Sequence, residues 1–148
     1  MSVSLLDVNV LIALFDPSHV HHERAHRWFG RNQRHGWATC PLTLNGCIRI
    51  FSNPAYASVS ATPAEVIDRL RIFCASPHHE FWADSVSLLD EEIFRSQLIA
   101  GHQTVTDIYL LGLAVRRHGR LATFDGTIAW QAMAHATAHH IVLIDRAG

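Results

Sequence analysis

The strongest constraint on the fold is an alternation of two residue patterns along the chain. Short apolar runs are typical of buried strands, and most are followed by a longer segment with apolar residues at helical spacing. We predict strands at residues 3–6, 37–40, 80–83, 120–124 and 140–144. We predict helices at residues 8–14, 18–34, 44–51, 62–75, 90–98, 106–119 and 127–134. This alternation predicts an α/β fold in which helices cover both faces of a central, mostly parallel sheet.

Several helix ends carry recognisable capping signals. Thr62 precedes Pro63 and Glu65, which together form a capping box with proline at the first helical position. Ser18 and Thr106 are predicted to cap the helices that follow them. Gly119 is predicted to stop the helix that starts near Thr106.

The composition indicates one ordinary globular domain, with residues 1–148 as a single unit. The chain has 148 residues, of which 49% are hydrophobic and 17% charged, and its formal net charge is −1. Its net charge therefore gives no overall positive electrostatic potential that would favour nucleic-acid binding. Its three cysteines lack the CxxC spacing of a metal or redox site, and no stretch is long enough to span a membrane. We expect a cytoplasmic protein with no membrane association.

Three aspartates stand where a parallel sheet gathers functional groups. Asp7 and Asp125 end the predicted strands near residues 3–6 and 120–124, and Asp107 lies at the start of the helix from Thr106. In such folds, ligands bind beyond the carboxyl ends of the strands, so the three side chains are predicted to converge. Crowded carboxylates raise one another's pKa, and a divalent cation removes that penalty.

Mg²⁺ or Mn²⁺ is the predicted cofactor, because both ions prefer oxygen ligands and leave positions for water and phosphate. Asp7, Asp107 and Asp125 are the candidate metal-binding and catalytic residues. Asn9, Thr106 and Thr123 are the neighbouring polar residues that we expect to orient the carboxylates or water. The alternative is that the aspartates are loop or capping residues, and Asp107 taken alone fits that interpretation better.

Arginine and histidine supply further candidates. All 12 basic residues are arginines, and we expect Arg49 and Arg116, with Arg117 and Arg120, to bind substrate phosphate at the rim of the cleft. A solvated surface is the equally simple alternative for them. Histidines stand four residues apart at 22 and 26 and at 135 and 139, a spacing that suits a zinc site on a helix. No cysteine or acid completes either pair, so exposed helix faces are the simpler interpretation.

Four segments resemble the PIN-domain ribonucleases, and most closely the VapC-type toxins of bacterial toxin–antitoxin pairs. They are LLDVNVLIALFD at residues 5–16, CPLTLNGCIRIFSNP at 40–54, TDIYLLGLA at 106–114 and LATFD at 121–125. The resemblance implies a PIN-like three-layer sandwich and Mg²⁺- or Mn²⁺-dependent cleavage of RNA. It also implies a homodimer and a cognate antitoxin that blocks the site. Asp7, Asp107 and Asp125 match the family's metal-holding acids.

One position departs from the family pattern. The family shows P-L-T-E-N-G where this chain has Pro41-Leu42-Thr43-Leu44-Asn45-Gly46, so Leu44 replaces an expected glutamate. Leucine has no donor atom for a metal, and we therefore expect metal binding and cleavage to be weakened or abolished. One alternative is a non-catalytic PIN-fold protein that binds RNA or an antitoxin. A phosphatase-like hydrolase is disfavoured, because Asn9 stands where its second aspartate would be.

Overall fold

A parallel five-stranded sheet forms the centre of the molecule. The computed structural model describes residues 2–56, 58 and 60–145, and its strands lie in the order β3-β2-β1-β4-β5. They are β1 (Ser4–Leu6), β2 (Trp37–Thr39), β3 (His79–Phe81), β4 (Arg120–Thr123) and β5 (Ile141–Leu143). In the register of the central strand, Leu5 lies opposite Ala38 on one side and Leu121 on the other. The predicted parallel sheet is confirmed, and the strand predicted at residues 80–83 is the edge strand β3.

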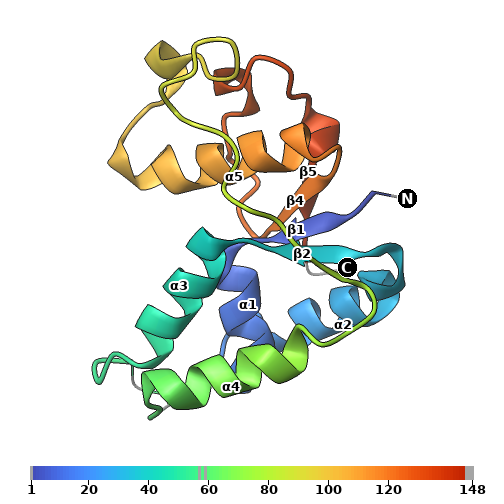
Figure 1. The fold of residues 1–148 in the computed structure, drawn as a ribbon, viewed down its shortest axis with the longest axis vertical. Coiled ribbons are helices and arrows are strands. Elements are labelled where there is room, and N and C mark those ends of the chain that lie inside the picture. Colours follow the sequence, from blue (N-terminus) through green and yellow to red (C-terminus); the bar gives the residue numbers. More distant parts are fainter. Residues whose placement is uncertain (1, 57, 59, 146–148) are drawn as a thin grey trace.

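Helices cover both faces of the sheet and make three layers (Figure 1). One face carries α1 (Val8–Phe15), α2 (His22–Asn32), α3 (Pro41–Phe51) and α4 (Pro63–Phe73), and the other carries α5 (Val105–Arg116). Successive side chains of a strand point to opposite faces, so Leu6 packs into the core on the α1–α4 side and Leu5 into the core on the α5 side. The predicted three-layer α/β sandwich is confirmed.

The predicted helix ends are partly right. Thr62 accepts a hydrogen bond from the Glu65 backbone N–H, and Pro63 occupies the first turn of α4, as predicted. The end of α5 differs, because the left-handed residue there is His118, with φ 58°, rather than Gly119. Gly119 is required for another reason: a Cβ on it would lie 2.6 Å from the Val3 carbonyl oxygen.

Two predicted caps are wrong. Helix α2 begins at His22, and Ser18 instead lies in a turn where its backbone N–H donates to Asp16 Oδ1 at 2.9 Å. Helix α5 begins at Val105, one residue before Thr106, so Thr106 lies inside the first turn. Each helix begins where the preceding turn ends, so the capping preference of a single residue did not predict the start of α2 or α5.

The helices predicted at residues 90–98 and 127–134 do not form. Only short 3₁₀ turns occur there, at Ser96–Leu98 and Trp130–Ala132. The two segments pair with each other: the Arg95 N–H donates to the Ala132 carbonyl, and the Ala134 N–H donates to the Ile93 carbonyl, each at 2.7 Å. These bonds use backbone groups that a helix would need. Among the described residues, no helix has the length and apolar content needed to cross a membrane.

Candidate active site

Asp7 is held rigidly at the carboxyl edge of the sheet. Its backbone N–H donates to the Ala122 carbonyl of β4 at 3.1 Å, and its carbonyl accepts the N–H groups of Val10 and Leu11 in α1. The residue is 6% exposed. Although Asp7 is the N-cap residue of α1, its side chain makes no capping hydrogen bond. The backbone therefore fixes the residue between strand and helix, and the carboxylate is left for another role.

Thr123 connects Asp7 with Asp125. The Thr123 hydroxyl donates to Asp7 Oδ2 at 3.0 Å, and its oxygen accepts the Asp125 backbone N–H at 3.1 Å. Asp125 is exposed, and its Oδ1 accepts both the backbone N–H and the hydroxyl of Thr127, at 2.8 and 2.6 Å. Thr127 thus orients the carboxylate of Asp125, and Thr123 orients that of Asp7, which is distant in the sequence.

The electrostatics bring Asp107 into the same group. Burial, together with the charges of Asp7 and Asp125, raises the pKa of Asp107 to about 6. Burial also raises the pKa of Asp7, with a smaller rise from Asp125 and opposing hydrogen bonds from Thr123 and the Val8 backbone. Charge effects of this kind require short separations. The electrostatics therefore couple Asp107, at the start of α5, with Asp7 and Asp125, which follow β1 and β4. That the three side chains form one site stays a prediction.

The donor set fits a hard divalent cation. A buried carboxylate beside two others is disfavoured in its charged form, and a cation with oxygen ligands reverses that penalty. Among the described residues, no three acidic, histidine or cysteine side chains stand close enough together to hold an ion. The fit therefore rests on the type of donor and on the charge of the site.

The other predicted polar residues divide into two groups. Thr123 is buried and bonded to Asp7, as described above. Asn9 and Thr106 are exposed, in the first turns of α1 and α5, next to the carboxylates in sequence. Within the part of the chain that the structure describes, Thr123 is the one member of the three with a hydrogen bond to a site carboxylate.

Arg116, which we expected at the rim of this site, lies at the far end of α5 from Asp107. Arg116 ends α5, nine residues after Asp107, which is about 13 Å along a helix. Arg120 begins β4 and pairs in register with Ser4, so it lies at the amino edge of the sheet, and Arg117 lies between them in sequence. Arg49 is exposed on α3 and lines a shallow hollow with Tyr56. A helix that contributes an acid at one end presents its C-terminal arginines at the other.

Leu44 belongs to the predicted apolar stripe of α3, but this stripe faces α4. Leu44 and Ile48 line an apolar hollow of about 210 Å³ together with Ile67 and Leu70 of α4. The side of α3 that meets the start of α1 is occupied by Gly46, where a Cβ would lie 3.1 Å from Val8. Position 44 is two residues from Gly46, roughly 200° around the helix. The Leu44 side chain therefore points away from the side of α3 that approaches Asp7.

A cluster of Phe124 with Arg24 and His21 was not found from the sequence. The Arg24 guanidinium carbon lies 4.8 Å from the centre of the Phe124 ring, and the His21 ring centre lies 4.6 Å from it. Arg24 also bonds His21 Nε2 at 3.0 Å. The i, i+3 spacing of His21 and Arg24 indicates that the two side chains can meet on one helix face. Their contact with Phe124 depends on the tertiary fold and cannot be predicted from this spacing.

The histidine pair at 22 and 26 has a structural role. His22 Nδ1 lies 2.7 Å from the Ala13 carbonyl oxygen, and His26 Nε2 lies 2.9 Å from the Leu14 carbonyl oxygen. A carbonyl only accepts, so each ring donates to a carbonyl of the last turn of α1 that has no partner within the helix. A nitrogen that donates in this way is not available to a metal, which argues against a zinc site here.

No family model matches the chain, but relatives with known names do. It is 43% identical to Ribonuclease VapC44 of Mycobacterium tuberculosis over 141 residues, which cover 95% of this chain and 99% of the relative. It is 46% identical to Ribonuclease VapC39 of the same organism over 131 residues, which cover 88% and 94%. The crystal structure of Mycobacterium tuberculosis VapC20, a toxin that cleaves the sarcin–ricin loop, matches with a TM-score of 0.60 at 10% identity, covering 89% of this chain and 97% of that one. That likeness supports the fold, and the two closer relatives establish that the chain belongs to the VapC ribonucleases.

Proposed function

We propose that the protein is a divalent-metal-dependent endoribonuclease toxin whose active site consists of Asp7, Asp107 and Asp125. The observation that carries the proposal is the coupling of the three carboxylates. Asp7 is almost fully buried, and the pKa values of Asp7 and Asp107 are raised by burial and by the charges of neighbouring members of the group. A site that concentrates negative charge at such cost to stability is typical of catalysis.

Each residue has a distinct part in the proposed mechanism. Thr123 donates to one oxygen of Asp7 and so leaves the other oxygen to bind a ligand. Asp107 must lose its proton before it can bind a cation. Asp125 is exposed, so we propose that it faces the substrate and the attacking water. A bound Mg²⁺ or Mn²⁺ would lower the pKa of water and stabilise charge on the phosphate and the leaving oxygen.

We propose that the site operates with three carboxylates and does not need an acid at position 44. This proposal replaces the expectation that Leu44 weakens or abolishes cleavage. It is supported by the packing of Leu44 against Ile67 and Leu70 of α4, on a side of α3 turned away from Asp7. A glutamate there would lose apolar contacts without reaching the other carboxylates.

The expected partners follow from the family. We propose that the protein acts on RNA in the cytoplasm, forms a homodimer and is inhibited by a cognate antitoxin. The support is the family membership and the family resemblance of the motifs, with 43–46% identity to two VapC ribonucleases over most of both chains. The antitoxin would have to cover the carboxyl edge of the sheet to inhibit the chemistry proposed here.

RNA cleavage with defined metals tests the proposal. We expect the full chain to cleave a structured RNA with Mn²⁺ or Mg²⁺, and chelator to stop the reaction. Asp7→Asn should reduce cleavage at least 100-fold, because it removes the charge of the most buried carboxylate. Asp68→Asn is the matched control, since Asp68 is an exposed acid on α4 paired with Arg71.

Two outcomes would contradict the proposal. Equal cleavage by wild type and Asp7→Asn would place the chemistry elsewhere. A wild-type melting temperature that rises with Mn²⁺, together with no RNA cleavage under any condition, would favour the non-catalytic alternative.

A further inference from the structure

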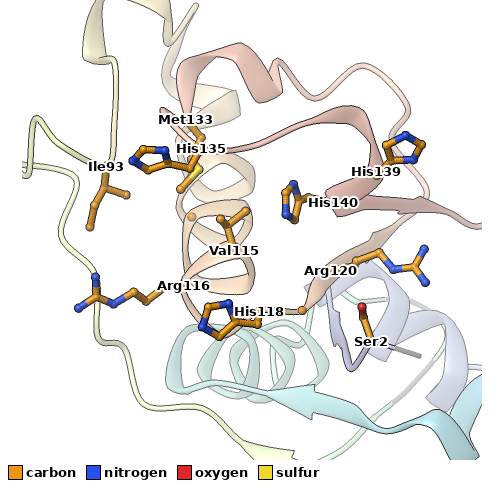
Figure 2. Close-up of a pocket in the computed structure, with 12 residues that line it drawn as sticks. Ser2, Ile93, Val115, Arg116, His118, Arg120, Met133, His135, His139 and His140 are labelled. Atoms are coloured by element: carbon orange, nitrogen blue, oxygen red, sulfur yellow. The ribbon is translucent and has the colours of Figure 1, made fainter.

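A large cavity lies at the opposite edge of the sheet from the three aspartates. It has a volume of about 850 Å³, within the range of roughly 300–1,000 Å³ typical of small-molecule sites. Its lining comes from the amino ends of β1, β4 and β5, the C-terminal end of α5 and the paired segments around residues 93 and 133. We call it the amino-edge pocket (Figure 2).

The polar lining of the amino-edge pocket is entirely neutral or basic. It contains no acidic residue, and its polar side chains are Ser2, Arg116, His118, Arg120, His135, His139 and His140. Figure 2 shows Arg116 and Arg120 on either side of His118, with their guanidinium groups extending to opposite sides of the view. Neither arginine has an ion-pair partner among the residues that the structure describes. An uncompensated guanidinium group at the rim of the cavity favours an anion, and phosphate above all.

The orientation of His140 adds a directed donor. Its Nδ1 accepts the Thr137 backbone N–H at 3.0 Å. A neutral imidazole that accepts at Nδ1 carries its proton on Nε2, so Nε2 is left as a donor. His140 is only partly exposed, and its ring lies over the middle of the pocket in Figure 2. A donor in this position suits an oxygen-rich ligand.

Part of the lining is apolar. Met133 is 3% exposed, and Val115 and Ile93 are partly buried in the core on the α5 side. A simple anion would leave these apolar side chains exposed to water, whereas a ligand with a flat heterocyclic ring would cover them. Imidazole rings such as those of His118 and His140 also provide faces on which a nucleobase can stack.

A metal ion is the competing ligand for four histidines in one cavity. Within the described residues, however, no three histidine, cysteine, aspartate or glutamate side chains are placed to hold an ion. The histidines approach from separate segments, namely the end of α5, the turn after Met133 and the approach to β5. Their arrangement therefore suits several separate contacts with a larger ligand.

We propose that the amino-edge pocket binds a nucleoside phosphate, with the phosphate on Arg116 at the rim and the base against Val115, Met133 and the imidazole rings. The ligand is either a free nucleotide or one nucleotide of an RNA strand, because both present the same chemistry. This site is separate from the proposed catalytic carboxylates, since Arg116 and Asp107 occupy opposite ends of α5.

Titration calorimetry on the full chain tests the proposal with three probes: adenosine 5′-monophosphate, adenosine and inorganic phosphate. We expect the monophosphate to bind more tightly than either part alone. Arg116→Ala should weaken it about tenfold or more, as expected for loss of a charge-assisted hydrogen bond. Arg117→Ala is the matched control, because Arg117 is the exposed neighbour on the same helix end and does not line the pocket.

Three results would overturn the proposal. They are equal binding of inorganic phosphate and the monophosphate, equal effects of Arg116→Ala and Arg117→Ala, or a change of oligomeric state in Arg116→Ala by light scattering. The last result would mean that a second copy covers the pocket. As a second readout, the monophosphate should shift the ring-proton resonances of His118 and His140, and unmoved resonances would contradict this location.

Competition separates the two ligand sources. The Asp7→Asn chain is used here, so that RNA survives and a failure of the proposed nuclease function is detected independently of this pocket. A single-stranded RNA oligonucleotide that displaces the monophosphate identifies an RNA strand as the ligand. An oligonucleotide that leaves it bound identifies a free nucleotide.

Discussion

The two edges of the sheet carry opposite chemistry on the same strands. At the carboxyl edge, Asp7 and Asp125 follow β1 and β4, and Thr123 ties them together. At the amino edge, Arg120 begins β4, and Arg116 and His118 lie just before it. The carboxyl edge is acidic and includes the buried Asp7 and Thr123, while the amino edge is basic and lined by arginine and histidine side chains. Parallel strands thus keep the acidic and basic groups a strand length apart.

The sharpest test of this separation is Asp7→Asn. We expect at least a 100-fold loss of RNA cleavage and unchanged affinity for adenosine 5′-monophosphate, because the pocket lies at the other edge. Cleavage with Mn²⁺ and calorimetry on the same preparation measure both. A large loss of nucleotide affinity would show that the two edges act as one binding surface.

Thr123→Val tests how the carboxyl edge is held together. Valine keeps the shape but removes the hydroxyl that donates to Asp7 and accepts from Asp125. We expect a loss in Mn²⁺ affinity of about 10–100-fold, as is typical when a group that orients a metal ligand is removed. Metal titrations followed by thermal melting measure it, with Thr127→Val as the control for the Asp125 turn alone. An unchanged Mn²⁺ affinity would mean that Asp7 needs no such support.

Leu44→Glu tests which part of α3 belongs to the carboxyl edge. We expect a loss of stability of about 1.5–3 kcal/mol if the buried contacts are lost in full, with no gain in Mn²⁺ response or cleavage. Leu44→Ala is the control, since it removes apolar contacts without adding charge. A larger metal-induced rise in melting temperature for Leu44→Glu than for wild type would restore position 44 as an acidic ligand and contradict the three-carboxylate site.

Of these substitutions, Asp107→Asn should have the smallest effect, which is a change in the free energy of unfolding in the absence of metal. The folded-state pKa of Asp107 is raised to about 6 from 3.8, so the folded chain binds the extra proton between these values. Stability from this group is therefore present at low pH and is lost as the pH rises through about 6. In chelator at pH 7.5, Asp107→Asn should be more stable than wild type by about 1–2 kcal/mol, allowing for solvent screening.

Thermal melts of both chains at pH 5 and pH 7.5 measure this effect. The difference between the chains should shrink at pH 5, where Asp107 of the wild type is largely protonated. A difference that stays the same at both pH values would mean that Asp107 does not titrate in this range.

The sequence was sufficient where a residue's role depends on its immediate neighbours. Strands β1 and β4 are buried apolar runs, and the aspartate after each lies at the carboxyl edge by the geometry of parallel strands alone. Thr62 and Pro63 marked the start of α4 for the same local reason. The three-layer architecture and the parallel sheet follow from such patterns.

Other features depend on which distant segments meet. Residues 93–95 and 132–134 pair with each other, and nothing local distinguishes that pairing from two helices. The apolar residues of α3 are spaced as expected for a helix, but the sequence does not show that Leu44 and Ile48 face α4. Arg116 was placed by residue type, whereas the length of α5 after Asp107 puts it at the other edge.

The hydrogen bond from Thr123 to Asp7 joins residues 116 positions apart. During synthesis the ribosome therefore releases the first acid long before β4, the strand that orients it, and before Asp125. A nascent or truncated chain that ends within α5 lacks both Thr123 and Asp125. If the site works as proposed, the nuclease is harmless to the ribosome that makes it until β4 has been made, and an antitoxin needs to intercept only molecules that have passed this point.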